Sequence, residues 1–212
     1  WCVELEQLFY QYNPWWEKGY QFEGMIKREN LLVKLYPRLL TTEVIMLTGL
    51  RRVGKTTTMK ALIAHLIEQE QVEPQHCFYV SMDDYQLYKM SIIDVIDAYR
   101  KIMKLSISQK IYVFLDEITY IEQFQIQLKN LYDKGQVKCI VSSSSSSILK
   151  DDSAYLTGRK RVVEINPLSF EEFLQFKNIN LSKADEGLRE GYFLDYMQVG
   201  GMPEYVLGGG RE

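Results

Sequence analysis

One short stretch has the residue types of a phosphate-binding loop. It reads Gly49-Leu-Arg-Arg-Val-Gly-Lys-Thr56 and fits the pattern G-x-x-x-x-G-K-[ST]. Glycines permit positive φ angles and a close approach of the backbone to an anion, and the amides of such a loop can point at phosphate oxygens. We therefore expect the following residues to bind the phosphates of a nucleotide: Gly49, Arg51, Arg52, Val53, Gly54, Lys55, Thr56 and Thr57.

Two side chains of this loop have separate tasks. Lys55 is expected to reach the β and γ phosphates, and the hydroxyl of Thr56 is expected to ligate Mg²⁺. Arg51 and Arg52 are not expected to be catalytic, because the loop backbone matters more than these side chains, which are expected to face solvent or a neighbouring subunit. Because a helix over 55–70 begins at the loop, its unpaired N–H groups and its positive dipole end would face the same anion.

A pair of acids supplies the second half of the chemistry. The run Ile111-Tyr-Val-Phe-Leu-Asp-Glu117 is an apolar strand that ends in two adjacent carboxylates. Ligands of parallel sheets bind at the carboxyl ends of the strands, so Asp116 is expected to hold Mg²⁺ through a water molecule. Glu117 is a candidate general base for an attacking water. The pair favours hydrolysis of a nucleotide over binding alone.

Strands and helices alternate over most of the chain. Apolar residues at helical spacing predict helices over 55–70, 91–105 and 121–132. Short apolar runs predict strands over 43–48, 77–81, 110–115, 137–141 and 162–165. This alternation predicts an α/β fold with a mainly parallel five-stranded sheet between helices. With the glycine loop after the first strand, the expected architecture is a P-loop NTPase three-layer sandwich.

Three regions are expected along the chain. Residues 1–24 form an extension rich in aromatic residues, which we expect to pack on the body of the domain, with a partner contact as the alternative. Residues 25–167 form the core. Residues 168–212 form a small helical lid, whose first helix has a capping box at Ser169 and Glu172. The glycines at its end are typical of a linker, so more protein is expected to follow.

Composition narrows the class of protein. The 212 residues carry a formal net charge of −3, which does not indicate a nucleic-acid binder. No apolar run approaches the roughly 20 residues that a membrane helix needs. The three cysteines are far apart and form no C-x-x-C pair, so we expect reduced thiols, no zinc site and a cytoplasmic protein.

Together, the loop and the acidic strand resemble the Walker A and Walker B motifs of AAA-type P-loop ATPases, and within them the STAND group of bacterial and archaeal predicted ATPases. Further segments resemble that group. They are Met25-Ile-Lys-Arg-Glu-Asn30, similar to an hhGRE box with lysine in place of glycine, Leu156-Thr-Gly-Arg-Lys160 with Asn166-Pro-Leu-Ser-Phe-Glu-Glu-Phe173, and Gly200-Gly-Met-Pro-Glu204. The resemblance implies ATP and Mg²⁺ as ligands.

The resemblance also implies roles for single residues. Arg28 would lie near the base or sugar, and Pro203 near adenine. Ser142 would be the polar sensor of the γ-phosphate, with Ser144 as second choice, because this run of serines follows the fourth strand as the group's T-G-S-S turn does. Arg159 would stabilise the charge of the transition state, with a plain surface position as the alternative.

Two classes of function stay open at the level of sequence. The first is an ATPase that hydrolyses Mg·ATP between the sheet and the helical lid. The second is a slow nucleotide-dependent switch or scaffold that acts through a protein partner or a C-terminal effector domain. A homo-oligomer is open in both. The lack of an N-K-x-D motif disfavours a GTPase, and the acidity of the chain argues against a DNA motor.

Overall fold

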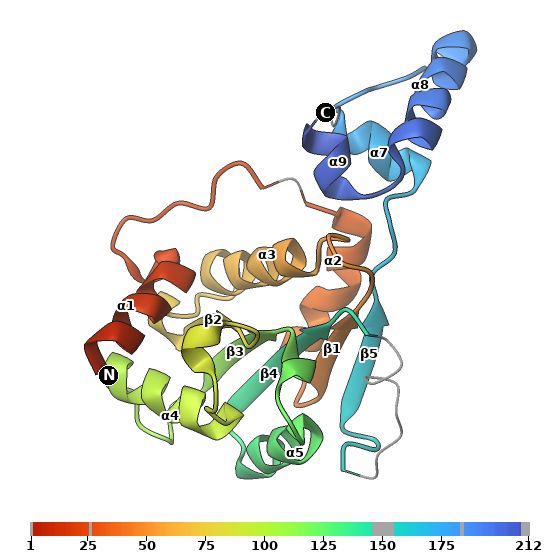
Figure 1. Ribbon diagram of the computed structural model, residues 1–212. Coiled ribbons are helices and arrows are strands. Elements are labelled where there is room, and N and C mark those ends of the chain that lie inside the picture. The colour runs from red at the N-terminus through yellow and green to blue at the C-terminus, as the bar shows by residue number, and fades with distance from the viewer. Residues whose placement is uncertain (1, 26, 146–154, 183–184, 209–212) are drawn as a thin grey trace.

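A computed structural model of the chain describes residues 2–25, 27–145, 155–182 and 185–208, and it shows a sheet between helices with a further group of helices set apart (Figure 1). The sheet has five strands in the order β2-β3-β4-β1-β5, and all neighbouring strands are parallel. The strands are β1 (Val44–Thr48), β2 (Cys77–Ser81), β3 (Ile111–Asp116), β4 (Val137–Ser143) and β5 (Lys160–Glu164). The predicted α/β fold is confirmed.

The central strands are almost entirely apolar because helices cover both faces of the sheet. Every side chain of β1 and β3 is buried. Strand β4 lies between them, and its Ile140 is paired with Ile45 of β1 and Phe114 of β3. Because the strands run parallel, the loop after β1 and the acids at the end of β3 reach the same edge of the sheet.

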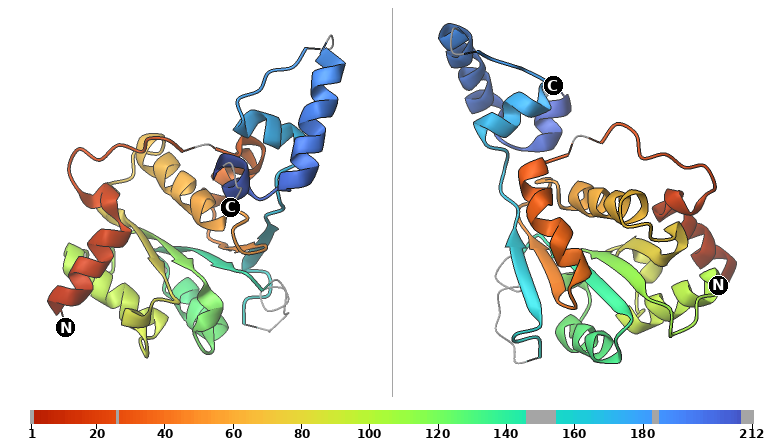
Figure 2. Two further views of the ribbon diagram at one scale, coloured as in Figure 1. Left: turned by 45° about the horizontal axis from the view of Figure 1, so that its top comes forward. Right: turned by 180° about the vertical axis from the view of Figure 1, so that it is seen from behind.

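Helices α2 (Glu29–Leu35) and α3 (Lys55–Glu68) lie on one face of the sheet, and α4 (Ile92–Met103) and α5 (Phe124–Lys134) lie on the other (Figure 2). Helix α5 begins later than the predicted 121, because a 3-10 turn and a left-handed residue, Gln123 with φ of 54°, follow β3. The 3-10 turns are Pro14–Trp16, Tyr36–Leu40, Pro74–His76, Tyr85–Leu87 and Ile118–Tyr120. Within the described ranges, no helix is long and apolar enough to cross a bilayer.

The N-terminal extension packs along β2, which is an edge strand of the sheet. Its helix α1 (Cys2–Tyr12) and the turn that follows contribute Phe9, Trp15 and Trp16 to the main core. The rings of Phe9 and Trp16 both pack on Phe78 of β2. The extension is thus part of the sheet domain, which agrees with the expected packing on its body.

Three helices follow the sheet and stand apart from it (Figure 1): α7 (Phe170–Phe176), α8 (Glu186–Val199) and α9 (Pro203–Gly208). They share a small apolar cluster, separate from the main core, of Leu168, Phe173, Leu174, Phe176 and Val206. Helix α7 has the predicted capping box, in which the amide of Glu172 donates to Ser169 Oγ at 3.2 Å. Of the expected linker 208–210, residues 209 and 210 lie outside the described residues.

Candidate active site

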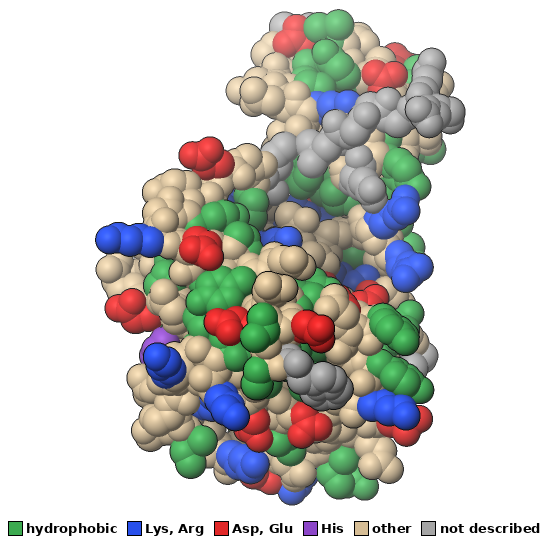
Figure 3. All heavy atoms as spheres, turned by 60° about the vertical axis from the view of Figure 1, so that its left-hand side comes forward, with side chains coloured by type: hydrophobic (Ala, Val, Ile, Leu, Met, Phe, Trp, Pro, Cys, Tyr) green, Lys and Arg blue, Asp and Glu red, His purple; other side chains and the backbone are tan. Residues whose placement is uncertain are grey.

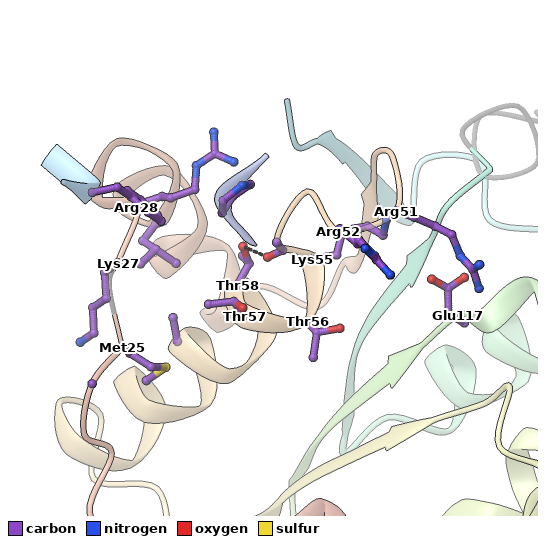
Figure 4. A pocket seen from close by; sticks show the side chains of 16 residues that line it. Met25, Lys27, Arg28, Arg51, Arg52, Lys55, Thr56, Thr57, Thr58 and Glu117 are labelled. Carbon is purple, nitrogen blue, oxygen red and sulfur yellow. Dashed lines mark hydrogen bonds between the residues drawn. The ribbon is translucent and has the colours of Figure 1, made fainter. Parts of the chain in front are cut away.

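A cavity of about 780 Å³ lies where the loop after β1, helix α3 and the C-terminal helices meet. Figure 3 shows a hollow below the C-terminal helices, with Lys or Arg side chains inside it. Figure 4 shows how the side chains that line the cavity converge from the loop, from α3 and from the segment before α2. A cavity of this size is suited to a small-molecule ligand.

Basic side chains dominate the lining of this cavity. Among the lining residues Glu117 is the one acid, against five bases, which are Lys27, Arg28, Arg51, Arg52 and Lys55. Such an excess of positive charge in a cleft attracts an anion. The lining also has apolar members, which are Met25, Leu32, Ala61, Phe176 and Pro203. Met25 lies at the far end of the cavity from Glu117 (Figure 4), so the cavity offers an anionic ligand both charge and apolar contact.

The two glycines of the loop are required for different reasons. Gly54 has φ of 102°, which favours glycine, and it is the N-cap of α3. Gly49 approaches the chain after β5 so closely that a Cβ there would lie 2.5 Å from the carbonyl oxygen of Ile165. Helix α3 begins at Lys55, so the positive end of its dipole lies at the loop.

Val53 does not join the lining of the cavity. Its side chain is fully buried beneath the loop, where a Cβ on Gly49 would come within 2.9 Å of it. The side chain of Val53 therefore packs into the core, and a contact of Val53 with a nucleotide, which stays a prediction, would be made by its backbone. Thr56 and Thr57 do line the cavity, together with the adjacent Thr58, which the sequence did not single out.

Lys55 lines the cavity and is largely buried. Its Nζ donates to the carbonyl oxygens of Gly49 at 2.7 Å and Leu50 at 2.8 Å. Burial lowers the pKa of Lys55, and the nearby carboxylates of Glu117 and Asp116 act in the opposite direction. A cation thus lies between the phosphate loop and the two predicted acids.

The carboxylate of Asp116 accepts hydrogen bonds from three hydroxyl groups. Thr56 and Tyr79 donate to Oδ2, Tyr79 at 2.7 Å, and Ser142 donates to Oδ1. Asp116 is only 4% exposed. The structure therefore brings together Thr56 and Asp116, the two residues expected to bind Mg²⁺, at one edge of the sheet.

Glu117 has an unusual backbone conformation. Its φ is 52°, a left-handed value that costs a non-glycine residue about 1–3 kcal/mol and is typical of functional sites. Its carboxylate accepts a hydrogen bond from Ser144 Oγ at 2.9 Å. Figure 4 shows that this carboxylate and the guanidinium of Arg51 point toward one another. The side chain is thus available to a ligand in the cavity.

The two candidate sensor serines occupy different places. Ser142 is fully buried, and besides its contact with Asp116 it accepts a hydrogen bond from the amide of Glu117 at 3.1 Å. Ser144 Oγ contacts Glu117 and accepts from Lys55 Nζ at 3.4 Å. Ser144, the second choice, is thus the serine that contacts both Lys55 and Glu117, whereas Ser142 contacts Asp116 and the amide of Glu117. The sensor role stays a prediction for both.

Arg28 lines the cavity, but its guanidinium is held by the C-terminal part of the chain. Its Nε and Nη2 donate to the two carboxylate oxygens of Glu172 at 2.8 Å and 3.1 Å, and its Nη1 donates to the carbonyl oxygen of Asn166 at 2.8 Å. Pro203, at the start of α9, also lines the cavity. Arg52 donates to the hydroxyl of Tyr205 on α9 at 3.4 Å.

Arg159 lies at the opposite edge of the sheet from the cavity. Its carbonyl accepts a hydrogen bond from the amide of Val44, at the start of β1, whereas the phosphate loop follows the end of β1. Its guanidinium pairs with Asp133 at 3.6 Å and lies over the ring of Tyr132. Arg159 therefore cannot stabilise the transition state in the cavity of its own chain, and this expectation is wrong. It lies where the parallel strands begin, whereas the cavity lies where they end.

Besides Thr58, Tyr79 and Phe176 contribute to the site without having been predicted. Tyr79 is one of four consecutive buried residues of β2, and the sequence gives no signal that its hydroxyl reaches Asp116. Phe176 is one apolar residue of α7, and its contact with the cavity depends on how the C-terminal helices lie. The substitution of lysine for glycine at Lys27 was visible as a departure from the family pattern, and it adds a base to the cavity.

Comparisons with known proteins agree with this geometry. Residues 41–174 match the model of a family described as an AAA domain. An uncharacterized protein of Methanocaldococcus jannaschii is 34% identical over 146 residues, which are 68% of this chain and 30% of that protein. The Orc1 protein of Aeropyrum pernix in complex with DNA has a TM-score of 0.58 at 14% identity, over 93% of this chain and 62% of that chain. AMPPCP-bound DnaA from Aquifex aeolicus has a TM-score of 0.55 at 16% identity, over 88% and 61%.

The parallel sheet and the glycine loop with its helix define a P-loop nucleotide-binding protein. The chain belongs to the AAA domain family, whose model covers more than half of it. Its fold is that of the AAA-type P-loop ATPases. The chain spans between 30% and 46% of the length of the curated relatives it matches.

Proposed function

We propose that the cavity binds ATP together with Mg²⁺ and hydrolyses it to ADP and phosphate. The observation that carries this proposal is the contact of Thr56 with Asp116 beside the buried ammonium of Lys55. It joins a phosphate loop, a metal ligand and a cation at one point, which is what transfer of a phosphoryl group to water requires.

The ligand would lie along the basic side of the cavity. Lys55, Arg51 and Arg52 would offset the charge of the triphosphate. The adenine ring would lie among the apolar side chains, where Pro203 and Phe176 reach the cavity from the C-terminal helices. The family resemblance favours adenine over other bases.

The donor atoms fit magnesium. Thr56 Oγ1 and, through water, Asp116 would hold the ion, with phosphate oxygens completing its coordination. No cluster of three or more His, Cys, Asp or Glu suited to a metal occurs in the described part of the chain, which agrees with an ion that arrives with the nucleotide. When bound, Mg²⁺ neutralises charge on the phosphates and orients them.

Glu117 would act as the general base. Its carboxylate takes a proton from the water that attacks the γ-phosphorus, and the bond from that phosphorus to the β–γ bridging oxygen breaks. Lys55 and Arg51 stabilise the negative charge on the transferred group. Ser144, which donates to Glu117 at 2.9 Å, holds the base in position.

We further propose that the protein is of the STAND type and acts in the cytoplasm. The first point rests on the segments that resemble that group, and the second on the three free thiols, of Cys2, Cys77 and Cys139. In this proposal residues 25–167 act as the ATPase core and residues 168–212 as its lid.

Two substitutions test the ATPase proposal. Lys55→Ala is expected to abolish ATP binding, and Glu117→Gln to bind ATP as the parent does while turnover falls by about 10²–10⁴-fold. Equilibrium binding and phosphate release measure the two effects separately. Lys34→Ala and Glu68→Gln, which remove the same charges from exposed helix positions, serve as controls. Hydrolysis by Glu117→Gln at the parent rate would show that Glu117 is not the base.

A second candidate function is a nucleotide-dependent switch. Helix α8 has no buried side chain, and its Leu188, Leu194 and Met197 are 59%, 59% and 64% exposed. Exposed apolar side chains on a helix of the lid favour contact with a partner, with the rest of a longer chain or with a second copy. A switch would bind ATP tightly and hydrolyse it alone at no more than about 10⁻³ per second. A parent rate far above that value in single-turnover assays would exclude it.

A further inference from the structure

Tyr79 joins the edge strand of the sheet to the predicted metal ligand. In the register of the parallel pair β2–β3, Tyr79 is opposite Phe114 and Ser81 is opposite Asp116. Alternate residues of a strand share a face, so Tyr79 lies on the face of Asp116, two residues further back. A tyrosine is long enough to span this rise of about 6.6 Å, and its hydroxyl reaches Asp116 Oδ2 at 2.7 Å.

The backbone of Tyr79 is fixed by the N-terminal extension. The side chain of Asn13 donates to the Tyr79 carbonyl oxygen at 2.8 Å and accepts from the Tyr79 amide at 2.6 Å. It also donates to the carbonyl oxygen of Phe9 at 2.7 Å, and it is fully buried. The indoles of Trp15 and Trp16 both donate to the carbonyl oxygen of Cys77. Side chains of the extension thus supply hydrogen-bond partners to backbone groups of β2, which in the described sheet has a neighbouring strand on its other side alone.

The hydroxyls around Asp116 divide between its two oxygens. Ser142 donates to Oδ1, while Thr56 and Tyr79 donate to Oδ2. A Thr56 hydroxyl that ligates a metal ion uses a lone pair and keeps its O–H, so it can still donate to Oδ2. Ser142 and Tyr79 are the two donors that would not ligate the ion themselves, and they act on different oxygens of Asp116. One donor on each oxygen fixes the plane of a carboxylate.

We propose that Tyr79 is a positioning residue for Mg²⁺ binding, because it holds the carboxylate of Asp116 in the orientation that the ion requires. The proposal rests on the proposed Mg·ATP function. Partners that orient a metal-binding carboxylate contribute about 10–100-fold to metal affinity. Tyr79 therefore acts on the metal through Asp116 and need not touch the nucleotide.

Tyr79→Phe tests the proposal, because it removes one oxygen and keeps the ring. The whole chain is titrated with Mg²⁺ in the presence of a fluorescent ATP analogue, and with Mn²⁺ followed by electron paramagnetic resonance. We expect the half-saturating metal concentration to rise by about 10–100-fold. Binding of the analogue in EDTA is expected to stay within about twofold of the parent, since the change acts on the metal alone.

Tyr12→Phe is the matched control. The Tyr12 ring packs edge-on against the Tyr79 ring with centroids 5.8 Å apart, and its hydroxyl donates to Asp84 instead of Asp116. We expect its metal titration to match the parent. A Tyr79→Phe titration that also matches the parent would overturn the proposal, and so would an equal shift in both variants, or a Tyr79→Phe chain that does not fold. A parent that binds no nucleotide would instead contradict the proposed function.

Discussion

At the scale of single residues, the charge that develops on a transferred phosphoryl group has to be met by a cation in the cavity. Arg51 is the arginine best placed for this task. It lines the cavity, its guanidinium is turned toward Glu117 (Figure 4), and its charge acts on the nearby ammonium of Lys55. Arg159, with its ion pair to Asp133, is at the other edge of the sheet.

This difference predicts opposite results for two arginine substitutions. Arg51→Ala should lower the turnover of ATP by about 10²–10³-fold, the usual loss when one group that stabilises the transition state is removed. Arg159→Ala should leave turnover nearly unchanged, because it removes an exposed ion pair at the edge of the sheet opposite the cavity. Steady-state phosphate release measures both. Equal losses in both variants would mean that Arg159 acts on the site of a neighbouring copy.

The residues of the two motifs could be predicted from the sequence because their chemistry fixes their types. Lys55, Thr56 and Asp116 were identified in this way, and the structure brings them together. Tyr79 was not identified from the sequence, and Ser144 was only the second choice for the sensor. Both make contacts between different strands or the loops that follow them. Such contacts depend on register, which no motif encodes.

At the scale of elements, the pair Arg28–Glu172 links the segment before α2 to α7, the first of the C-terminal helices. Both side chains are largely buried, with 11% and 16% of their surface exposed. The two N–H groups of Arg28 meet the two oxygens of Glu172, a geometry that lysine cannot reproduce. The contact therefore ties the wall of the cavity to the helices that carry Phe176 and Pro203.

Arg28→Lys should loosen the lid. We expect weaker ATP binding, by about tenfold for a loss of about 1.5 kcal/mol in charge-assisted hydrogen bonding, and faster hydrogen exchange in α7 and α9. Arg161→Lys is the control, since Arg161 pairs with Glu43 at 3.1 Å away from the cavity. Unchanged exchange in α7 and α9 would show that the pair does not hold the lid.

The contact of Asn13 with the edge of β2 should contribute to stability. Asn13→Ala leaves the amide and carbonyl of Tyr79 without their buried partner, which should cost about 2–4 kcal/mol in the free energy of unfolding. Denaturant unfolding measures the loss. Asn130→Ala, at an exposed position of α5, should change the unfolding free energy by less than about 1 kcal/mol. Equal values for the two variants would contradict the role of the extension as an edge cover.

At the scale of the whole molecule, the sheet domain and the C-terminal helices close one cavity between them. The sheet could be predicted because its apolar strands and amphipathic helices alternate in sequence. The parallel order of the strands also determines the place of Arg159. A residue just before a parallel strand lies at the opposite edge of the sheet from a residue just after a strand. The motif resemblance had instead suggested that Arg159 lies near the γ-phosphate. A site between the sheet and the C-terminal helices was expected from the sequence. The contacts that hold these helices beside the cavity, such as Arg28–Glu172, could not be predicted, because they depend on tertiary packing.

The central claim is that a triphosphate and its metal ion lie where the glycine loop meets the end of β3. A structure determined with Mg²⁺ and a non-hydrolysable ATP analogue tests it most directly. We predict that the β and γ phosphates contact Lys55, and that the ion is liganded by Thr56 and linked through water to Asp116. An analogue bound outside this cavity, or an ion that does not touch Thr56, would contradict the account.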